Sequence, residues 1–209
     1  NRFYTGRFEG SFAAGVPFQH NEDTGDMRIC GTAASLAGLE QALRQRDEAL
    51  AGLALRRLHM LYGVLCSIGG IPLIFLGEEW AVLNDYAYLK QPDKADDSRW
   101  IHRPRADWDL FRNEVEQEGT FRNRHFEGMR ALFAERKRQP TLQGAAMRLL
   151  PGENPHVLTY LRENGSHRLA VLANFSEQDQ VVDLRGWRAQ GLAHFFRDVF
   201  TGRSFSTGG

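Results

Sequence analysis

One short apolar run, set between a glycine pair and two acids, constrains the fold of this chain more than any other feature. Its sequence is Gly69-Gly70-Ile71-Pro72-Leu73-Ile74-Phe75-Leu76-Gly77-Glu78-Glu79. A run this short with no polar alternation predicts a β-strand covered on both faces, as in a parallel sheet. Pro72 lacks an N–H for the hydrogen-bond ladder, so it belongs at the entrance of that strand. The polar stretch that follows, residues 78–108, would then lie where α/β barrels carry their functional sites.

The composition of the whole chain is that of a globular protein. Its 209 residues are 42% hydrophobic and 25% charged, which allows a packed core. Lys and Arg total 26, as do Asp and Glu, and this balance argues against a nucleic-acid surface or a polybasic membrane patch. Cys30 and Cys66 are too few for a disulfide framework. No apolar stretch reaches the length that spans a bilayer, and we expect a cytoplasmic protein.

The first two thirds of the chain combine a phenylalanine- and glycine-rich start with helices. Residues 1–31 keep no helical period and contain turn residues, which predicts a loop or small subdomain. Four phenylalanines supply its own small core: Phe3, Phe8, Phe12 and Phe18. Strong helix formers fill Ala33–Ser67, where we expect Thr32 as the cap and a break near Gly52. A further helical pattern covers Phe121–Arg138.

Beyond Pro140 the hydrophobic period changes to two, which predicts an antiparallel β domain. The strand candidates are Met147–Leu150, Val157–Leu161, Leu169–Phe175, Val181–Leu184 and His194–Phe200. Asn164-Gly165 suits both left-handed positions of a type I′ turn and therefore predicts a hairpin. Across this hairpin we expect Thr159 and Leu161 to pair with Leu169 and Val171.

Neighbouring acids occur at two places in the polar stretch. Glu78 and Glu79 point to opposite sides of an extended chain, so they cannot both flank one substrate bond. We favour a buried, hydrogen-bonded support at the end of the strand over a catalytic role for either. Asp96 and Asp97 lack a third ligand at a regular spacing, and the seven His residues form no metal-binding pattern. We therefore predict no metal site and no cofactor.

Two polar groups are candidates for binding. The segment Asp96–Pro104 combines Asp–Arg pairs with Trp100, an apolar platform of the kind on which sugar rings stack. A structural loop held by its own Asp–Arg bonds explains the same residues equally well. Gln19, Asn21 and Arg28 form the second group, in a loop where binding residues concentrate. Taken alone, these three residues are better explained as ordinary surface.

Several motifs of this chain resemble a known family. The stretch Gly70–Glu79 looks like the GxPxxYxGxE segment on the eighth barrel strand of the α-amylase superfamily. The flanking stretches that narrow the resemblance are Glu9–Gln19, Gly25–Ala33, Leu83-Asn84-Asp85, Asp96–Pro104 and Leu172–Ser176. Together they resemble the amylosucrase and sucrose hydrolase branch of that superfamily (glycoside hydrolase family 13).

The resemblance implies the C-terminal part of a (β/α)8 TIM barrel followed by an antiparallel β-sandwich-like domain. Residues 1–40 would be part of an inserted loop and helix subdomain. Residues 41–139 would be the last part of the catalytic barrel, with Ile71–Leu76 as its eighth strand. Residues 140–209 would form the C-terminal β domain. The remainder of the same polypeptide would complete the barrel, and we expect the chain to be a piece of a longer protein.

The resemblance also implies a retaining α-glucosidic enzyme that cleaves sucrose and transfers glucose to water or to a glucan acceptor. The three catalytic carboxylates of the family would lie upstream of Asn1, so we expect no catalytic residue in this chain. Arg99 matches an arginine that pairs with an upstream acid at the blind end of the glucose pocket. Arg28, Gln19 and Asn21 match residues on the acceptor side of the cleft.

Two other functions remain open. One is a trehalose synthase or another α-glucosyltransferase of the same superfamily, and the other is a non-catalytic carbohydrate-binding protein with an amylase-like fold. Four residues depart from the family pattern: Met27, Cys30, Trp80 and Ala81. These departures leave open whether the glucose passes to water or to a glucan. A homodimer is compatible with the sequence, whereas neither nucleic acid nor a membrane is expected as a partner.

Overall fold

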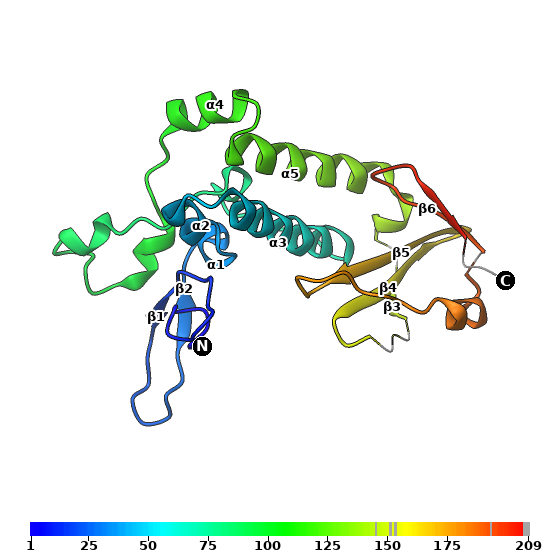
Figure 1. Ribbon diagram of the computed structural model, residues 1–209, viewed down its shortest axis with the longest axis horizontal. Coiled ribbons are helices and arrows are strands. Elements are labelled where there is room, and N and C mark those ends of the chain that lie inside the picture. The colour runs from blue at the N-terminus through cyan, green and yellow to red at the C-terminus, as the bar shows by residue number, and fades with distance from the viewer. Residues whose placement is uncertain (145, 151, 153, 193, 207–209) are drawn as a thin grey trace. The chain divides into compact units, whose positions relative to one another are not determined.

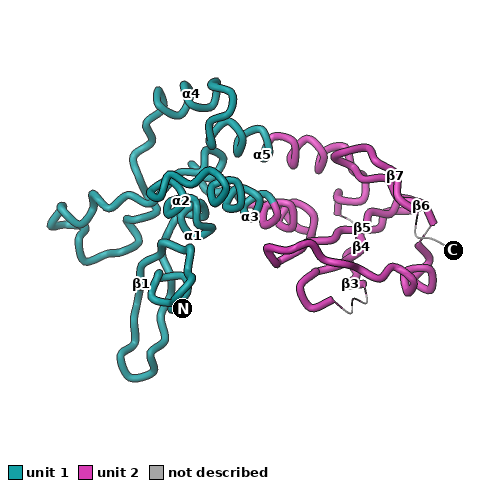
Figure 2. Tube along the Cα trace, in the orientation of Figure 1, with its two compact units in different colours: residues 1–59, 74–129 teal, residues 60–73, 130–209 magenta. Residues whose placement is uncertain are grey.

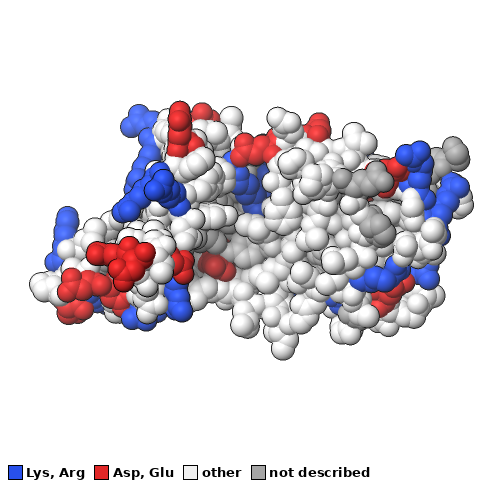
Figure 3. All heavy atoms as spheres, turned by 90° about the horizontal axis from the view of Figure 1, so that it is seen from below, with Lys and Arg blue, Asp and Glu red and all other residues white. Residues whose placement is uncertain are grey.

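The computed structural model describes residues 1–144, 146–150, 152, 154–192 and 194–206. The chain forms two compact units, residues 1–59 with 74–129 and residues 60–73 with 130–209 (Figure 2). The architecture is mixed, with helices followed by small antiparallel sheets (Figure 1). On the face drawn in Figure 3, acidic and basic side chains are interspersed in small groups.

The first unit begins with a short hairpin of β1 (Val16–Phe18) and β2 (Arg28–Cys30), followed by the helices α1 (Ala33–Leu36) and α2 (Leu39–Gln45). Thr32 caps α1 as predicted, because its Oγ1 accepts a hydrogen bond from the Ser35 N–H at 3.2 Å. The predicted phenylalanine core is present in part. The ring centroid of Phe3 lies 6.3 Å from that of Phe8 and 4.9 Å from that of Phe12.

The break in this helical region falls before α3 (Glu48–Ser67) and not near Gly52, which lies inside α3. Arg46 ends α2 with a φ of 57°, in the left-handed region. Asp47 then accepts a hydrogen bond from the Leu50 N–H at 3.0 Å, which is N-cap geometry. A left-handed residue followed by a side-chain cap ends one helix and starts another, whereas a single internal glycine costs only about 1 kcal/mol.

Helix α3 is long and apolar enough to cross a bilayer by length and composition, with a mean hydropathy of 1.2. No stretch of this kind was predicted from the sequence. Core helices pass the same test, and the side chains of Ala54 and Leu58 are 0% and 1% exposed. Arg56 and Arg57 stand in the middle of the helix. The buried part of its apolar stripe packs within the protein, whereas Leu50 and Leu61 of the same helix are 39% and 48% exposed.

Residues 71–76 do not form the predicted strand, and that prediction is wrong for this chain by itself. The side chains of Ile71 and Leu73 are 87% and 82% exposed. A parallel strand takes its hydrogen bonds from neighbouring strands. No strand of the described residues pairs with this segment, and the sheets they form are all antiparallel.

The polar stretch that follows is built from short helical turns. It contains the 3₁₀ helices η1 (Glu78–Trp80), η2 (Ala87–Lys90) and η3 (Ser98–His102). Helix α4 (Trp108–Glu116) follows it. Helix α5 (Phe121–Arg138) has the predicted bounds and is followed by η4 (Pro140–Leu142).

The second unit contains the predicted antiparallel β region. One sheet has the order β3 (Ala146–Leu149), β4 (Val157–Asn164) and β5 (His167–Asn174). A separate pair consists of β6 (Phe195–Arg197) and β7 (Ser204–Ser206), with η5 (Arg185–Gln190) before it. The predicted strand at Val181–Leu184 is not formed. Leu150, Leu161, Trp187 and Leu192 make the buried core of this unit.

The hairpin between β4 and β5 has a different register from the predicted one. Asn164 pairs with His167, so the two turn residues are Gly165 and Ser166. Gly165 has a φ of 58°, whereas Ser166 is not in the left-handed region. A turn with glycine first replaces the predicted Asn-Gly turn. Thr159 consequently pairs with Leu172, one residue beyond the predicted position.

Candidate functional site

The structure brings Arg99 next to the β1–β2 hairpin, within the first unit. The Ser98 hydroxyl donates a hydrogen bond to the Pro17 carbonyl at 2.9 Å, which ties η3 to β1. Ile101 of η3 is fully buried in a cluster with Cys30 and Tyr88. This packing places the Arg99 guanidinium 5.0 Å from the centroid of the Phe18 ring. At that distance the cation and the ring attract one another.

Arg99 is held by an acid of its own loop. Its Nε and Nη2 donate to the two carboxylate oxygens of Asp97 at 2.9 and 2.8 Å. These hydrogen bonds lower the pKa of the Asp97 carboxyl to about 2 and raise the pKa of Arg99. The geometry is that of a loop held by its own Asp–Arg pair. Half of the Arg99 side chain remains exposed, and its role in sugar binding stays a prediction.

Arg28 lies on β2, opposite Phe18 of β1. Arg28 is the direct cross-strand partner of Phe18, and such partners project from the same face of a hairpin. Phe18 therefore has Arg28 on one side and Arg99 against its ring. Both arginines are exposed. Phe18 thus relates two arginines that are far apart in the sequence, Arg28 by strand pairing and Arg99 by a ring contact.

Gln19 and Asn21 lie in the loop that joins the two strands, and both are exposed. Gln19 leaves β1 with a φ of 51°, in the left-handed region. The Asn21 Oδ1 accepts hydrogen bonds from the N–H groups of Asp23 and Thr24 at 2.9 and 3.1 Å. Asn21 therefore shapes the loop with its own side chain, and its predicted contact with sugar stays a prediction.

Glu78 and Glu79 support the turn that follows the apolar segment. Glu78 Oε2 accepts from the Phe75 N–H at 3.1 Å, and Glu79 Oε2 accepts from the Gly77 N–H at 2.8 Å. Both side chains are half-buried, less than the sequence analysis expected. Among the described residues, no group of three or more His, Cys, Asp or Glu side chains is placed to hold a metal ion.

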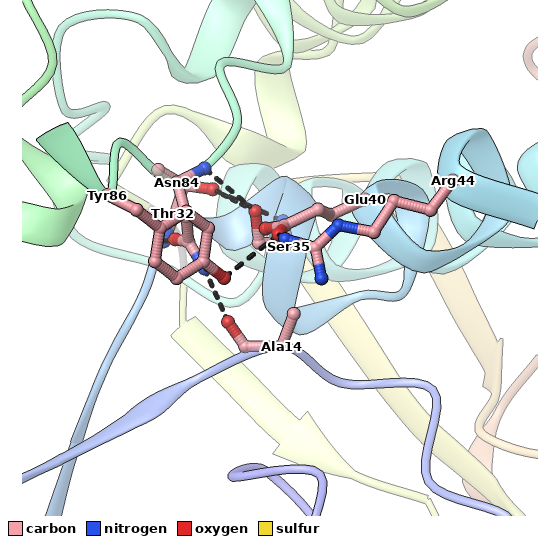
Figure 4. Close-up of polar contacts among 7 residues, drawn as sticks. All are labelled: Ala14, Thr32, Ser35, Glu40, Arg44, Asn84 and Tyr86. Atoms are coloured by element: carbon pink, nitrogen blue, oxygen red, sulfur yellow. Dashed lines mark hydrogen bonds and ion pairs between the residues drawn. The ribbon is translucent and has the colours of Figure 1, made fainter.

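Asn84 stands at the centre of a polar network for which the sequence analysis assigned no role (Figure 4). Its side chain and its backbone contact the residues that flank the β1–β2 hairpin. The sequence signal was the motif Leu83-Asn84-Asp85 in a polar loop, which shows nothing about partners some fifty residues away.

Comparison with known proteins supports the coarser part of the resemblance. Residues 147–209, which run from the second residue of β3 through β7, match the family model of the maltogenic amylase C-terminal domain. These matches make the chain similar to the C-terminal portion of α-amylase-superfamily proteins.

A particular relative is a trehalose synthase from Thermus thermophilus. This chain is 28% identical to it over 170 residues, which are 72% of this chain and 18% of the relative. The matched part is thus less than a fifth of the length of that relative. A match to a trehalose synthase favours the alternative function over the sucrose-cleaving one.

Proposed function

We propose that this chain is the C-terminal part of a retaining α-glucosidic enzyme that transfers a glucosyl unit to a sugar acceptor and forms trehalose. The observation that carries this proposal is the similarity to a trehalose synthase over 72% of the chain. Maltose is the matching donor, because it contains the same two glucose units as trehalose. One glycosidic bond at C1 breaks and another forms, with no further reactant.

The exposed apolar segment supports a place in a larger barrel. Four side chains within residues 71–76 are between 55% and 87% exposed: Ile71, Leu73, Phe75 and Leu76. Exposure of so many large apolar groups in one short stretch indicates a surface that another part of the protein covers. In the proposed enzyme the remaining barrel strands cover it, and they carry the paired carboxylates that retaining chemistry requires.

Within that enzyme this chain supplies binding groups. Arg99 closes the glucose pocket, and Arg28, Gln19 and Asn21 face the acceptor sugar. The contact of Arg99 with Phe18, which is the cross-strand partner of Arg28, supports a common site for these residues. Asp97 limits the rotation of the Arg99 guanidinium through two parallel hydrogen bonds.

Sucrose cleavage is the second candidate. The observation in its favour is the sequence around Arg99, Asp96-Asp97-Ser98-Arg99-Trp100, together with the stretches around Gln19 and Arg28 that resemble sucrose-cleaving enzymes. In that reaction the glucose of sucrose passes to water or to a glucan, and fructose leaves.

Product analysis of the full-length protein separates these functions. The protein is incubated with maltose alone and with sucrose alone, and the sugars are identified by chromatography. Trehalose from maltose supports the proposal, whereas fructose from sucrose with no trehalose from maltose supports the second candidate. Binding of either sugar without turnover would identify a non-catalytic carbohydrate-binding protein and overturn both.

The role of Arg99 is tested in the same assay. Arg99→Ala is expected to lower kcat/KM by about 100-fold, since a charged hydrogen-bonding group at the pocket would be lost. Arg185→Ala is the matched control, because the Nε and Nη2 of Arg185 likewise donate to the two carboxylate oxygens of Asp183 in the second unit. The control should stay within about twofold of the wild type. Equal losses in both variants would contradict the assignment.

A further inference from the structure

The residues predicted to bind sugar come from two segments that need a fixed spacing. Gln19, Asn21 and Arg28 belong to the hairpin of residues 16–30, and Arg99 belongs to the segment of residues 84–102. Near η3 these segments are joined by the contact between Ser98 and Pro17. At the base of the hairpin they are joined through Asn84.

Asn84 contacts the segment that enters the β1–β2 hairpin and the segment that leaves it (Figure 4). Its Nδ2 donates to the Ala14 carbonyl, two residues before β1. Its Oδ1 accepts from the Thr32 N–H at 2.8 Å, two residues after β2. Its own N–H donates to the Ser35 hydroxyl at 3.0 Å, and Ser35 is fully buried in α1. One side chain thus spans the two ends of the hairpin.

The orientation of the Asn84 amide is determined by its neighbours. Nδ2 also donates to the Tyr86 hydroxyl at 3.3 Å, and that hydroxyl donates to Glu40 Oε1 at 2.9 Å. Glu40 is 4% exposed and forms an ion pair with Arg44. Since a carboxylate only accepts, the Tyr86 oxygen must present a lone pair to Asn84. An aspartate at position 84 would have no donor for Ala14 or Tyr86.

We propose that Asn84 is a positioning residue that sets how the glucosyl group is divided between a sugar acceptor and water. The inference rests on the proposed function. In either outcome the bond from C1 of glucose to the enzyme breaks, a bond from C1 to an acceptor oxygen forms, and the acceptor proton passes to the acid/base carboxylate. A sugar acceptor competes with water only if the hairpin holds it at the reacting carbon.

The test uses the full-length protein with maltose and measures the ratio of trehalose to free glucose. This ratio describes each turnover and does not depend on how much of the protein is folded. Asn84→Ala and Asn84→Asp are expected to lower the ratio by at least about fivefold. Tyr86→Phe removes one link of the network and should lower the ratio less, while keeping the aromatic packing.

Asn123→Ala is the matched control. The Asn123 Nδ2 donates to the Val115 carbonyl at 2.8 Å and braces the connection between α4 and α5, away from both binding segments in sequence. The ratio of trehalose to glucose formed by Asn123→Ala should equal that of the wild type. An active wild type with an unchanged ratio in the Asn84 variants and in Tyr86→Phe overturns the role of Asn84 alone. A wild type that forms neither trehalose nor glucose from maltose overturns the proposed function and this inference with it.

Discussion

His125 on α5 is a fully buried side chain that links two parts of the first unit. Its Nε2 lies 2.8 Å from the Glu78 carbonyl oxygen, so the neutral ring carries its hydrogen on that nitrogen. The ring also stacks on His59, with centroids 5.2 Å apart and 9° between the planes. Gly128 permits this arrangement, because a Cβ there would lie 2.4 Å from the His59 ring. Burial lowers the pKa of His125 to about 4.

The His125 pKa predicts that the protein loses stability in mild acid. The unfolded chain takes up this proton near pH 6.5, whereas the folded chain takes it up only near pH 4. The unfolded state therefore binds more protons between these values, and the free energy of unfolding falls as the pH is lowered from 6.5 to 4. The shift corresponds to about 3 kcal/mol.

Urea unfolding at a series of pH values measures this effect. His125→Gln keeps a hydrogen-bond donor near the Glu78 carbonyl but does not titrate, so its stability should depend less on pH in that range. His59 is present in both proteins, and burial lowers its pKa in the wild type. Parallel curves for the two proteins would show that His125 is not the group responsible.

At the scale of elements, the C-terminus of α3 is held by side chains from α5 and β4. The last carbonyls of a helix have no partner within the helix and need other donors. The Arg162 Nη1 donates to the Ser67 carbonyl at 3.1 Å, and the Arg136 guanidinium donates to the carbonyls of Cys66 and Gly70. The Tyr160 hydroxyl lies 2.5 Å from the Ser67 hydroxyl. The β sheet is thereby joined to the helix through polar contacts.

Arg162→Met is expected to lower the free energy of unfolding of the second unit by about 1–3 kcal/mol. The methionine keeps much of the buried volume but leaves the Ser67 carbonyl without its charged donor. The measurement is chemical denaturation followed by the fluorescence of Trp187, which is buried in that unit. Arg203→Met replaces an exposed arginine of the same unit and should change little. A decrease in the free energy of unfolding below about 0.5 kcal/mol would contradict the proposed role of Arg162 in holding the C-terminus of α3.

At the scale of the whole molecule, the apolar segment 71–76 is exposed in this chain alone, and we expect it to be buried in the full-length enzyme. Leu73→Glu should be harmless in this chain alone, where Leu73 is 82% exposed. In the full-length protein the same change buries a charge against the barrel and should abolish the folded, active form. Val181→Glu is the control, because Val181 is 88% exposed in the second unit. The soluble yield and the thermal unfolding are measured for this chain and for the full-length protein. Equal effects of Leu73→Glu in the two proteins would refute the placement of residues 71–76 in a barrel.

The sequence by itself determined those features that depend on neighbouring residues. Helix 121–138 followed from its 3.6-residue period, and the cap at Thr32 followed from its hydroxyl before a helical run. The change to a period of two beyond Pro140 located the antiparallel β region, which the family comparison supports. Glu78 and Glu79 were also expected to act as hydrogen-bonded supports, because neighbouring side chains on an extended chain point to opposite sides, and both accept backbone hydrogen bonds.

Only the tertiary structure decided the features that depend on distant partners. Residues 71–76 have the composition of a strand, but a strand requires hydrogen bonds from neighbours, and the described residues supply none. The register of the β4–β5 hairpin was decided by cross-strand pairing, since a slip of one residue moves every side chain to the other face. Asn84 acquired its partners because folding brought Ala14 and Thr32 to it from 70 and 52 positions away. Local patterns report the energy of a short stretch, whereas these contacts exist only after the chain has closed on itself.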